Sequence, residues 1–252
     1  MGVPTVGCDC VVCTSKDHRD KRTRPSVLVN YKSGGRERNI LIDTSYDFRQ
    51  QALREGIKHL DAVLYTHAHA DHILGLDDVR SLSFRHADEN DGRLPLYASK
   101  ETAEQIKQVF AYIFDENSTY QTLPRVRLME LGDGVELFRA RFECIKVKHG
   151  EIEVDAFRFG SAAYITDFSE IPTAALERLH GLDILVLDAL RERGHPTHSS
   201  LSNSVALVKE LKPKRAYFTH MSHDLGYEAT NAKLPEHIRL AHDGLKVEFE
   251  IQ

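Results

Sequence analysis

The sequence predicts an α/β fold in which two mixed β-sheets are flanked by helices. Strand-like and helix-like segments alternate along all 252 residues, without internal repeats or low-complexity linkers. Strands dominate the hairpin-like regions and helices separate those regions, a pattern that favours layered sheets with helices outside them. A chain of this length can fold as one large α/β domain. We therefore predict a single domain over residues 1–252.

The first half of the chain opens with a predicted hairpin. Its strands are residues 26–31 and 39–43, and residues 33–35 form the glycine-containing turn between them. A short helix over residues 47–55 is closed by Gly56, because glycine readily adopts the left-handed backbone that ends a helix. The elements expected next are an apolar strand at 61–65, a helix at 71–79, a strand at 94–98 and a helix at 99–114.

The second half is richer in predicted strands. They lie within residues 126–147 and at 156–159, 162–166, 184–187, 215–219 and 246–251. The helices expected between them cover residues 172–179, 200–211 and 234–241.

Residues 66–72, Thr-His-Ala-His-Ala-Asp-His, follow directly on the apolar strand 61–65. Three imidazoles and one carboxylate, those of His67, His69, Asp71 and His72, therefore lie within six positions. Imidazoles and carboxylates suit zinc, iron or manganese, and their close spacing lets one turn present ligands to two ions. The pattern predicts half of a two-metal site; a solvated His-rich loop is the alternative.

Three later strand-like segments also end in a residue that can bind metal. The segment 143–148 ends at His149, the strand 162–166 at Asp167 and the strand 215–219 at His220. Any one of these residues could be an ordinary surface or core residue. Their joint placement at the ends of rigid strands favours a metal site, because such a site requires ligands that are held firmly in position.

The cysteines are unevenly distributed. Cys8, Cys10 and Cys13 lie within six residues, whereas Cys144 is alone in an apolar segment and is interpreted as a small buried hydrophobic residue. In a reducing compartment, three thiols so close together indicate metal coordination rather than disulfides. A closed structural zinc site needs a fourth ligand; a redox-active or incidental cluster is the alternative.

Composition and charge restrict the partners. A hydrophobic fraction of 41% with 28% charged residues is typical of a globular protein. The formal net charge of −5 provides no global basic field for nucleic acid, so a nucleic-acid partner is disfavoured but not excluded. The one basic run, residues 16–24, is interpreted as a solvated loop. No apolar stretch reaches the length of a membrane span, and no signal-peptide pattern begins the chain, so we expect a cytoplasmic protein without a membrane partner.

The motif His67-Ala68-His69-Ala70-Asp71-His72, with the later His149, Asp167 and His220, resembles the five-motif set of the metallo-β-lactamase superfamily. This resemblance implies an αββα sandwich of two mixed sheets flanked by helices. Within the superfamily, residues 2–4, the three clustered cysteines and residues 219–223 resemble the phosphoribosyl cyclic phosphodiesterases of bacterial phosphonate breakdown. The similarity spans nearly the whole chain.

The resemblance implies a binuclear centre of zinc or manganese. Its implied ligands are His67, His69 and His149 for one ion, Asp71, His72 and His220 for the second, and Asp167 between the two. Asp43, which follows a strand, would orient a ligand imidazole by a hydrogen bond. Two ions so placed can clamp a phosphodiester while metal-bound hydroxide attacks phosphorus. In this scheme Asp71 takes part in catalysis as a ligand, and His198 donates a proton or hydrogen bond to the leaving oxygen; a surface-loop histidine is the alternative for His198.

The same resemblance implies a structural zinc bound by Cys8, Cys10, Cys13 and His223. Such a site would attach the N-terminal loop to the segment after His220. Relatives usually carry an N-terminal strand and a Gly-Thr-Gly-Thr-Ser type turn before the Gly2-Val3-Pro4 motif. The family's first strand is therefore expected to be absent from this chain.

The expected function is binuclear metal-dependent hydrolysis of a small cyclic or ribose-linked phosphodiester. An RNA-processing hydrolase of the tRNA 3′-end type is one alternative, although the chain shows no long basic insert. A family from pyrroloquinoline quinone biosynthesis shares a similar cysteine cluster but has an altered metal site. The intact His67–His72 motif of this chain argues against membership of that family. A metal-stabilised binding protein without turnover is the alternative from another class. A small phosphodiester is the expected partner, and a homodimer is left open.

Overall fold

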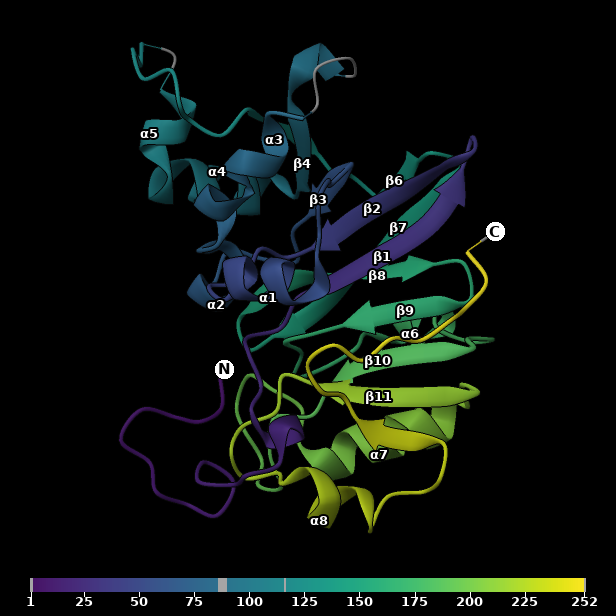
Figure 1. Ribbon diagram of the computed structural model, residues 1–252. Helices are drawn as coiled ribbons and strands as arrows, with labels where there is room; N and C mark the ends of the chain where they lie inside the picture. Colours follow the sequence, from purple (N-terminus) through teal and green to yellow (C-terminus); the bar gives the residue numbers. More distant parts are fainter. Residues whose placement is uncertain (1, 86–89, 116, 252) are drawn as a thin grey trace. The chain divides into compact units, whose positions relative to one another are not determined.

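The computed structural model describes residues 2–85, 90–115 and 117–251. Contacts between Cα atoms divide the chain into two compact units. The first-sheet unit is Arg24–Gly132, and the second-sheet unit combines Met1–Thr23 with Asp133–Gln252. Each unit contains one mixed sheet and its helices, as Figure 1 shows, and each is described by itself below.

The first-sheet unit contains a five-stranded sheet in the order β1-β2-β3-β4-β5. Strands β1 and β2 form the predicted antiparallel hairpin, whereas β2 to β5 run parallel. The strand bounds are β1 Val27–Ser33, β2 Arg36–Ile42, β3 Ala62–Leu64, β4 Leu94–Ala98 and β5 Val126–Glu130. The helices are α1 Phe48–Glu55, α2 Ala70–Ile73, η2 Leu76–Val79, α3 Arg80–Ser83, η3 Asn90–Gly92, α4 Lys100–Val109 and α5 Ala111–Phe114.

A buried apolar core supports this sheet. The side chains of Leu41, Val63 and Leu96, one from each of three neighbouring strands, pack with Phe48 of α1 and Ile106 of α4. Burying such side chains contributes roughly 1.5 to 3 kcal/mol each. This packing makes the carboxyl ends of β2 and β3 firm attachment points for the polar residues that follow them.

Two predicted helices of this unit are interrupted. The expected helix 71–79 is divided at Gly75, where a Cβ atom would lie 2.1 Å from the carbonyl oxygen of Ser45, so the chain turns at a residue that must lack a side chain. The expected helix 99–114 is divided at Phe110, whose backbone angles (φ −111°, ψ 40°) are not helical. By contrast, α1 ends as predicted, with Gly56 in the left-handed conformation at φ 65°.

The second-sheet unit contains a seven-stranded sheet in the order β12-β11-β10-β9-β8-β7-β6. Strands β6 to β9 are antiparallel neighbours, and β9 to β12 run parallel. The strand bounds are β6 Gly134–Leu137, β7 Ala140–His149, β8 Ile152–Phe159, β9 Ala162–Ile165, β10 Ile184–Asp188, β11 Arg215–Thr219 and β12 Ile238–Leu240. The helices are η1 His18–Asp20, α6 Thr173–Glu177, α7 Leu201–Leu211 and α8 Tyr227–Asn231.

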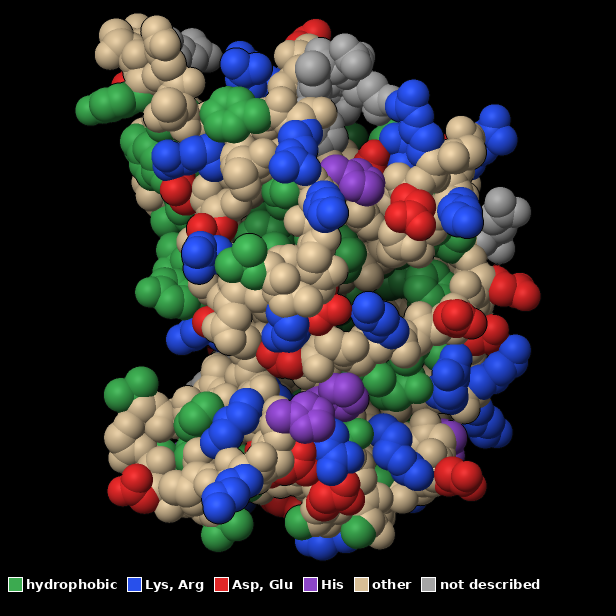
Figure 2. Space-filling model, in the orientation of Figure 1, with side chains coloured by type: hydrophobic (Ala, Val, Ile, Leu, Met, Phe, Trp, Pro, Cys, Tyr) green, Lys and Arg blue, Asp and Glu red, His purple; other side chains and the backbone are tan. Residues whose placement is uncertain are grey.

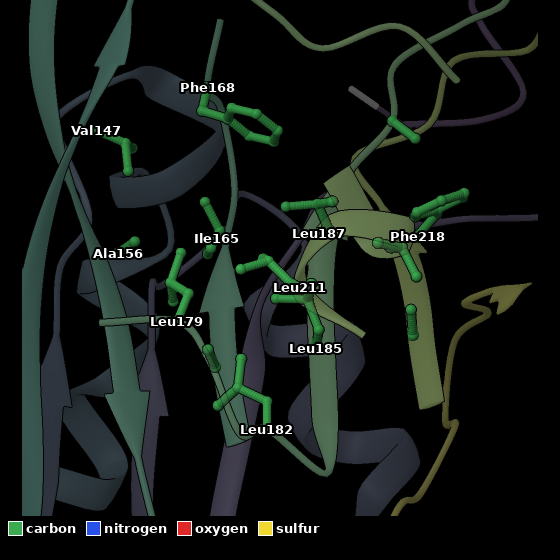
Figure 3. Packing of buried hydrophobic residues seen from close by; sticks show 14 of the residues in the cluster. Val147, Ala156, Ile165, Phe168, Leu179, Leu182, Leu185, Leu187, Leu211 and Phe218 are labelled. Carbon is green, nitrogen blue, oxygen red and sulfur yellow. The ribbon is translucent and has the colours of Figure 1, made fainter. Parts of the chain in front are cut away.

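One hydrophobic cluster holds the helices of this unit against its parallel strands. Figure 3 shows Leu185 and Leu187 of β10 among Leu182, Leu211 and Phe218, and all five side chains are buried. Because β9, β10 and β11 are parallel, their carboxyl ends lie at the same edge of the sheet. Residues that directly follow these strands are therefore brought together at that edge.

Two elements predicted near the C-terminus are wrong. The expected helix 234–241 contains instead the short strand β12, because pairing with β11 overrides a helical spacing of apolar residues that Pro235 already weakens. The expected strand 246–251 forms no ladder; Glu250 makes isolated hydrogen bonds to Ser161. Helix α8 was not predicted, because its five residues show no apolar period.

The described helices and surface charges bear on the expected partners. Among the described residues, none of the helices has both the length and the apolarity of a membrane span. On the face drawn in Figure 2, Lys and Arg side chains lie interspersed with Asp and Glu. Among the described side chains of that face, positive charges are therefore not separated from negative ones as in a patch that grips a nucleic-acid backbone.

The C-terminal segment should make Gly160 intolerant of any side chain. Gly160 and Gly181 both have left-handed backbones, with φ +58° and +74°, so alanine at either site costs about 1 to 2 kcal/mol of unfolding free energy. Only at Gly160 would the new Cβ atom also meet a neighbour, the carbonyl oxygen of Glu250 at 2.1 Å. We expect Gly160→Ala to destabilise by at least about 1 kcal/mol more than Gly181→Ala in chemical denaturation. Equal losses would show that residues 246–251 do not pack as described.

Candidate metal sites

The predicted histidine cluster of the first-sheet unit forms a compact group after β3. The ring of His67 lies 4.6 Å from that of His69 and 4.2 Å from that of His72, measured between centroids. Asp71 places a carboxylate oxygen 4.0 Å from Nε2 of His72. His67 and His72 are buried and His69 is exposed, so the group combines fixed and accessible ligand atoms.

Hydrogen bonds to Asp43 fix the orientation of this group. Its carboxylate, which is fully buried, accepts hydrogen bonds from Nδ1 of His72 (2.7 Å), from the backbone N–H of Thr66 (2.8 Å) and from Oγ1 of Thr66 (2.8 Å). Because the Thr66 hydroxyl donates to Asp43, it accepts from Nδ1 of His67 at 2.9 Å. Both imidazoles therefore carry their proton on Nδ1 and the lone pair of a metal ligand on Nε2.

The pKa of Asp43 reflects competing influences. Burial raises it, whereas the neighbouring His72 and the hydrogen bonds from Thr66 act to lower it. A carboxylate with three donors around it can remain ionised at a buried position because those donors replace its lost hydration. Asp43 can therefore support an electropositive group without touching it.

The second-sheet unit gathers a second set of candidate ligands. Nε2 of His220 lies 3.3 Å from one carboxylate oxygen of Asp167, and Nε2 of His198 lies 4.0 Å from the other. The ring of His149 is 4.7 Å from that of His198, between centroids. The described residues of this unit thus bring together all four side chains that were predicted to lie at strand ends or beside the reacting group.

Oxygen acceptors orient these rings as well. Nδ1 of His149 donates to the carbonyl oxygen of Thr197 at 2.6 Å, and Nδ1 of His198 donates to the buried carboxylate of Asp188 at 2.8 Å. Burial lowers the pKa of His149, which favours the neutral ring that a metal ligand requires. The donor set of neutral imidazoles and carboxylates fits divalent zinc or manganese.

Three of the predicted site residues have unusual backbone conformations. Asp43, Asp167 and His220 adopt left-handed φ values of 62°, 50° and 56°, and each follows a strand directly or after one residue. For a residue with a side chain this conformation is disfavoured and persists only where the surroundings impose it. The firmly packed strand ends impose it here and so direct the polar side chains away from the sheets.

Sequence reasoning missed Asp188, Thr66, Thr197 and His195. Asp188 is the last residue of β10 and has the same strand-end signal as Asp167, which could have identified it. Thr197 acts through its backbone carbonyl, which leaves no mark on the sequence. The ring of His195 lies 5.1 Å from that of His198, and burial together with the charges of His198 and Arg191 lowers the pKa of His195.

The cysteine cluster brings together, within the second-sheet unit, the four donor residues that a closed zinc site requires. Nδ1 of His223 lies 3.1, 3.7 and 3.4 Å from the sulfur atoms of Cys8, Cys10 and Cys13, respectively. Tetrahedral zinc with bonds of about 2.0 to 2.3 Å requires ligand atoms separated by roughly 3.5 Å. The backbone N–H of Cys13 donates to Cys10 and lowers the pKa of the Cys10 thiol, which favours the thiolate that binds metal. The four residues fit a zinc ion.

A buried arginine reinforces this attachment. Arg22 was expected in a solvated basic loop, but its side chain is only 5% exposed and donates to the carbonyl oxygens of Ser222 and Leu225. The backbone carbonyl groups of residues 222–225 thus hold the N-terminal loop at a second point. Together with the cysteine cluster, Arg22 fixes the segment that carries His220.

Comparison with known proteins identifies relatives whose family and fold agree with the predicted fold class. A family model described as the beta-lactamase superfamily domain matches residues 38–221. The crystal structure of a diphosphatase from the PhnP family is 56% identical and superposes with a TM-score of 0.91, covering 100% of this chain and 94% of that chain. Zinc-bound PqqB from Methylobacterium extorquens superposes with a TM-score of 0.72 at 21% identity, over 98% and 96% of the two chains, and shares the fold. These findings confirm the predicted fold class.

The curated relatives are longer than this chain. A Porphyromonas gingivalis protein named octanoyltransferase is 35% identical over 249 residues, which are 97% of this chain but 49% of that protein. A ribonuclease Z of Bradyrhizobium diazoefficiens is 27% identical over 146 residues, 57% of this chain and 46% of the relative. The chain thus spans about half the length of these two proteins.

Replacing the Asp43 carboxylate by an amide should weaken metal binding. Both oxygens of Asp43 accept hydrogen bonds. In either orientation, the NH2 group of Asp43→Asn would therefore face an N–H or O–H donor of Thr66 or His72 in place of an acceptor. We expect metal affinity to fall about 10- to 100-fold, as is typical when a partner that orients a ligand is lost. Competition with a metal indicator dye measures this change. Asp77→Asn, which alters a partly exposed carboxylate of the same unit, is the control; equal affinities in the two variants would contradict the role of Asp43.

Among cysteine substitutions, only those within the cysteine cluster should cause the loss of a bound zinc ion. Cys10→Ser should bind about one zinc ion fewer per chain and melt at a lower temperature, because structural zinc contributes directly to folding free energy. Cys144→Ser, which changes a buried cysteine outside the cluster, should keep its zinc even if its stability falls. Elemental analysis beside a melting curve measures both effects. An unchanged zinc content in Cys10→Ser would show that the cluster is not a zinc site.

Proposed function

Because the chain belongs to the beta-lactamase superfamily, whose family model matches residues 38–221, we propose that it is a metal-dependent phosphodiesterase. The proposed substrate is a small cyclic or ribose-linked phosphodiester. The observation that carries the proposal is the set of imidazoles whose Nδ1 atoms donate to fixed oxygen atoms and whose Nε2 atoms are thereby prepared for metal. The 56% identity to a diphosphatase supports hydrolysis at phosphorus.

The proposed centre holds two divalent ions, zinc or manganese. The proposed ligands are His67, His69 and His149 for one ion, Asp71, His72 and His220 for the other, and Asp167 for both. Each unit contributes imidazoles and at least one carboxylate, the mixture that these metals accept. When bound, two such ions stabilise the charge that develops on a phosphodiester and supply a nucleophile from water near neutral pH.

The chain's own residues would assist departure of the leaving group. The buried carboxylate of Asp188 holds Nδ1 of His198 at 2.8 Å and stabilises a protonated imidazole. The proton on Nε2 of His198 is then positioned beside Asp167, the residue proposed to bind both ions. We therefore assign His198 to donating a proton or hydrogen bond to the leaving oxygen, a step worth roughly 10² to 10⁴ in rate.

Two names among the relatives point elsewhere. Octanoyltransferase is the name of a protein of which this chain spans 49%, so the name need not describe the matched half. Ribonuclease Z represents the RNA-processing alternative, which would require a basic surface. The net charge of −5 and the interspersed charges in Figure 2 favour a small substrate instead. A reducing, cytoplasmic setting fits the proposal, since none of the four described cysteines forms a disulfide.

Removing a proposed ligand should abolish turnover without unfolding the protein. His67→Ala and Asp167→Ala each remove a ligand that follows a strand, and neither side chain belongs to the hydrophobic clusters. The test compares wild type with both variants, loaded with manganese or zinc, on bis(4-nitrophenyl) phosphate and ribose 1,2-cyclic phosphate. We expect wild-type turnover, variant turnover near background and similar melting curves. Wild type that binds metal but hydrolyses neither compound would favour a binding protein.

The role of His198 predicts a dependence on the leaving group. His198→Ala should lower kcat about 10²-fold or more for an alkoxide leaving group, while metal content stays unchanged. The loss should shrink for 4-nitrophenolate, which departs without a proton. A series of aryl and alkyl phosphodiesters measures this trend. Equal losses for good and poor leaving groups would rule out proton donation.

A further inference from the structure

His195 packs against His198, which in turn lies beside Asp167. In the loop between β10 and α7, the ring of His198 is stacked on that of His220, with centroids 4.8 Å apart and an interplanar angle of 15°. The ring of His195 lies on His198 at 5.1 Å and 58°. His220, His198 and His195 therefore form a row that begins at a proposed metal ligand and ends at a partly exposed side chain.

The hydrogen bonds of His195 determine which of its nitrogen atoms carries the proton. The backbone N–H of Thr197 donates to Nδ1 of His195 at 3.3 Å, and the hydroxyl of Thr197 lies 3.2 Å from the same atom. A nitrogen that accepts a backbone N–H cannot itself carry a proton, so the proton of the neutral ring is on Nε2. His195 consequently presents an N–H donor on the side of its ring opposite to Thr197.

The loop that carries His195 is held in place from both sides. Arg191 donates to the carbonyl oxygens of Arg193 (3.3 Å) and Gly194 (2.9 Å), the two residues before His195. On the other side, the carbonyl oxygen of Thr197 accepts from His149. The position of the His195 ring is therefore tied to that of a proposed metal ligand. A donor fixed in this way can contribute to recognition without a large cost in ordering.

We propose that His195 is a specificity residue that donates Nε2–H to a second phosphoryl group, so that the preferred substrates are diphosphate diesters. This inference rests on the proposed function, since it extends the site outward from the scissile phosphorus. His198 is proposed to donate to the bridging oxygen, which leaves. Nε2–H of the neighbouring His195 would then contact a non-bridging oxygen of the departing phosphoryl group. The 56% identical structure described as a diphosphatase is consistent with such a substrate.

The reaction is balanced without any further reactant. The oxygen of one water forms a bond to the first phosphorus, and the bond from that phosphorus to the bridging oxygen breaks. The bonding electron pair leaves on the bridging oxygen of the second phosphoryl group. Two phosphate monoesters result, and the two protons of the water are released as both monoesters ionise. Negative charge therefore accumulates on the second phosphoryl group, which a fixed N–H donor stabilises.

Selectivity kinetics test the proposal on the metal-loaded protein. The measured quantity is the ratio of kcat/KM for P1,P2-bis(4-nitrophenyl) diphosphate to that for bis(4-nitrophenyl) phosphate. His195→Phe keeps a ring against His198 but removes the donor, so the ratio should fall about 10- to 100-fold, the usual effect of losing a hydrogen bond to a charged group. His195→Gln places an amide N–H near the position of Nε2 and should recover much of the ratio.

His237→Gln is the matched control. His237 is exposed and lies just before β12, at the sheet edge opposite the carboxyl ends of the parallel strands, so its ratio should equal that of wild type. An unchanged ratio in His195→Phe would overturn the proposal. Equal loss on both substrates would also overturn it, because it would mean that His195 only positions His198. Absence of activity toward both substrates in wild type would contradict the proposed function rather than the role of His195.

An NMR experiment tests the role of His195 independently of turnover. Two-bond ¹H–¹⁵N correlations of the zinc-loaded protein should show His195 protonated on Nε2. Its ¹⁵N signals should shift on addition of P,P′-dimethyl methylenediphosphonate, a non-hydrolysable diphosphate diester analogue, more than on addition of dimethyl phosphate. A proton on Nδ1, or equal responses to the two compounds, would contradict the proposal.

Discussion

The hydrogen bonds that three of the proposed ligand imidazoles donate to fixed oxygen atoms are the interactions on which the candidate site depends. Nδ1 of His72 donates to Asp43, Nδ1 of His67 to Thr66 and Nδ1 of His149 to Thr197. An imidazole without such a partner would rotate and exchange its proton between the two nitrogens, which weakens it as a ligand. The strands matter functionally because their buried ends keep these oxygen atoms in place. The geometry of the candidate site is thus a consequence of core packing, which acts on it through single hydrogen bonds.

The N-terminal loop shows how a region without regular strands can be made equally firm. The described part of this loop, residues 2–23, contains one short helical turn and is held by contacts with residues 220–227. The cysteine cluster supplies one of these contacts, and the buried guanidinium of Arg22 and the carboxylate of Asp20 supply others. Because residues 220–227 begin with His220, a change at the cysteine cluster should also affect the proposed catalytic metals.

The candidate ligands left a clearer pattern in the sequence than the groups that support them. An apolar segment followed by His or Asp indicates a strand end, which is why His67, His149, Asp167 and His220 could be proposed as ligands without a structure. Thr197 could not, since it orients His149 through a carbonyl group that every residue possesses. Arg22 appeared to be one charge of a solvated run because its carbonyl partners are distant in sequence. The predicted helix at 234–241 failed for a similar reason: its strand β12 exists through pairing with β11, a non-local interaction.

The proposal that two neighbouring ions are bound by ligands from both units can be tested most directly by anomalous diffraction at the manganese edge. Crystals grown with manganese should show two peaks about 3.5 to 4 Å apart, the spacing of two-metal hydrolase sites. His67, His69 and His149 should surround one peak, Asp71, His72 and His220 the other, and Asp167 should contact both. A single peak, or peaks that contact ligands of only one unit, would contradict the binuclear centre.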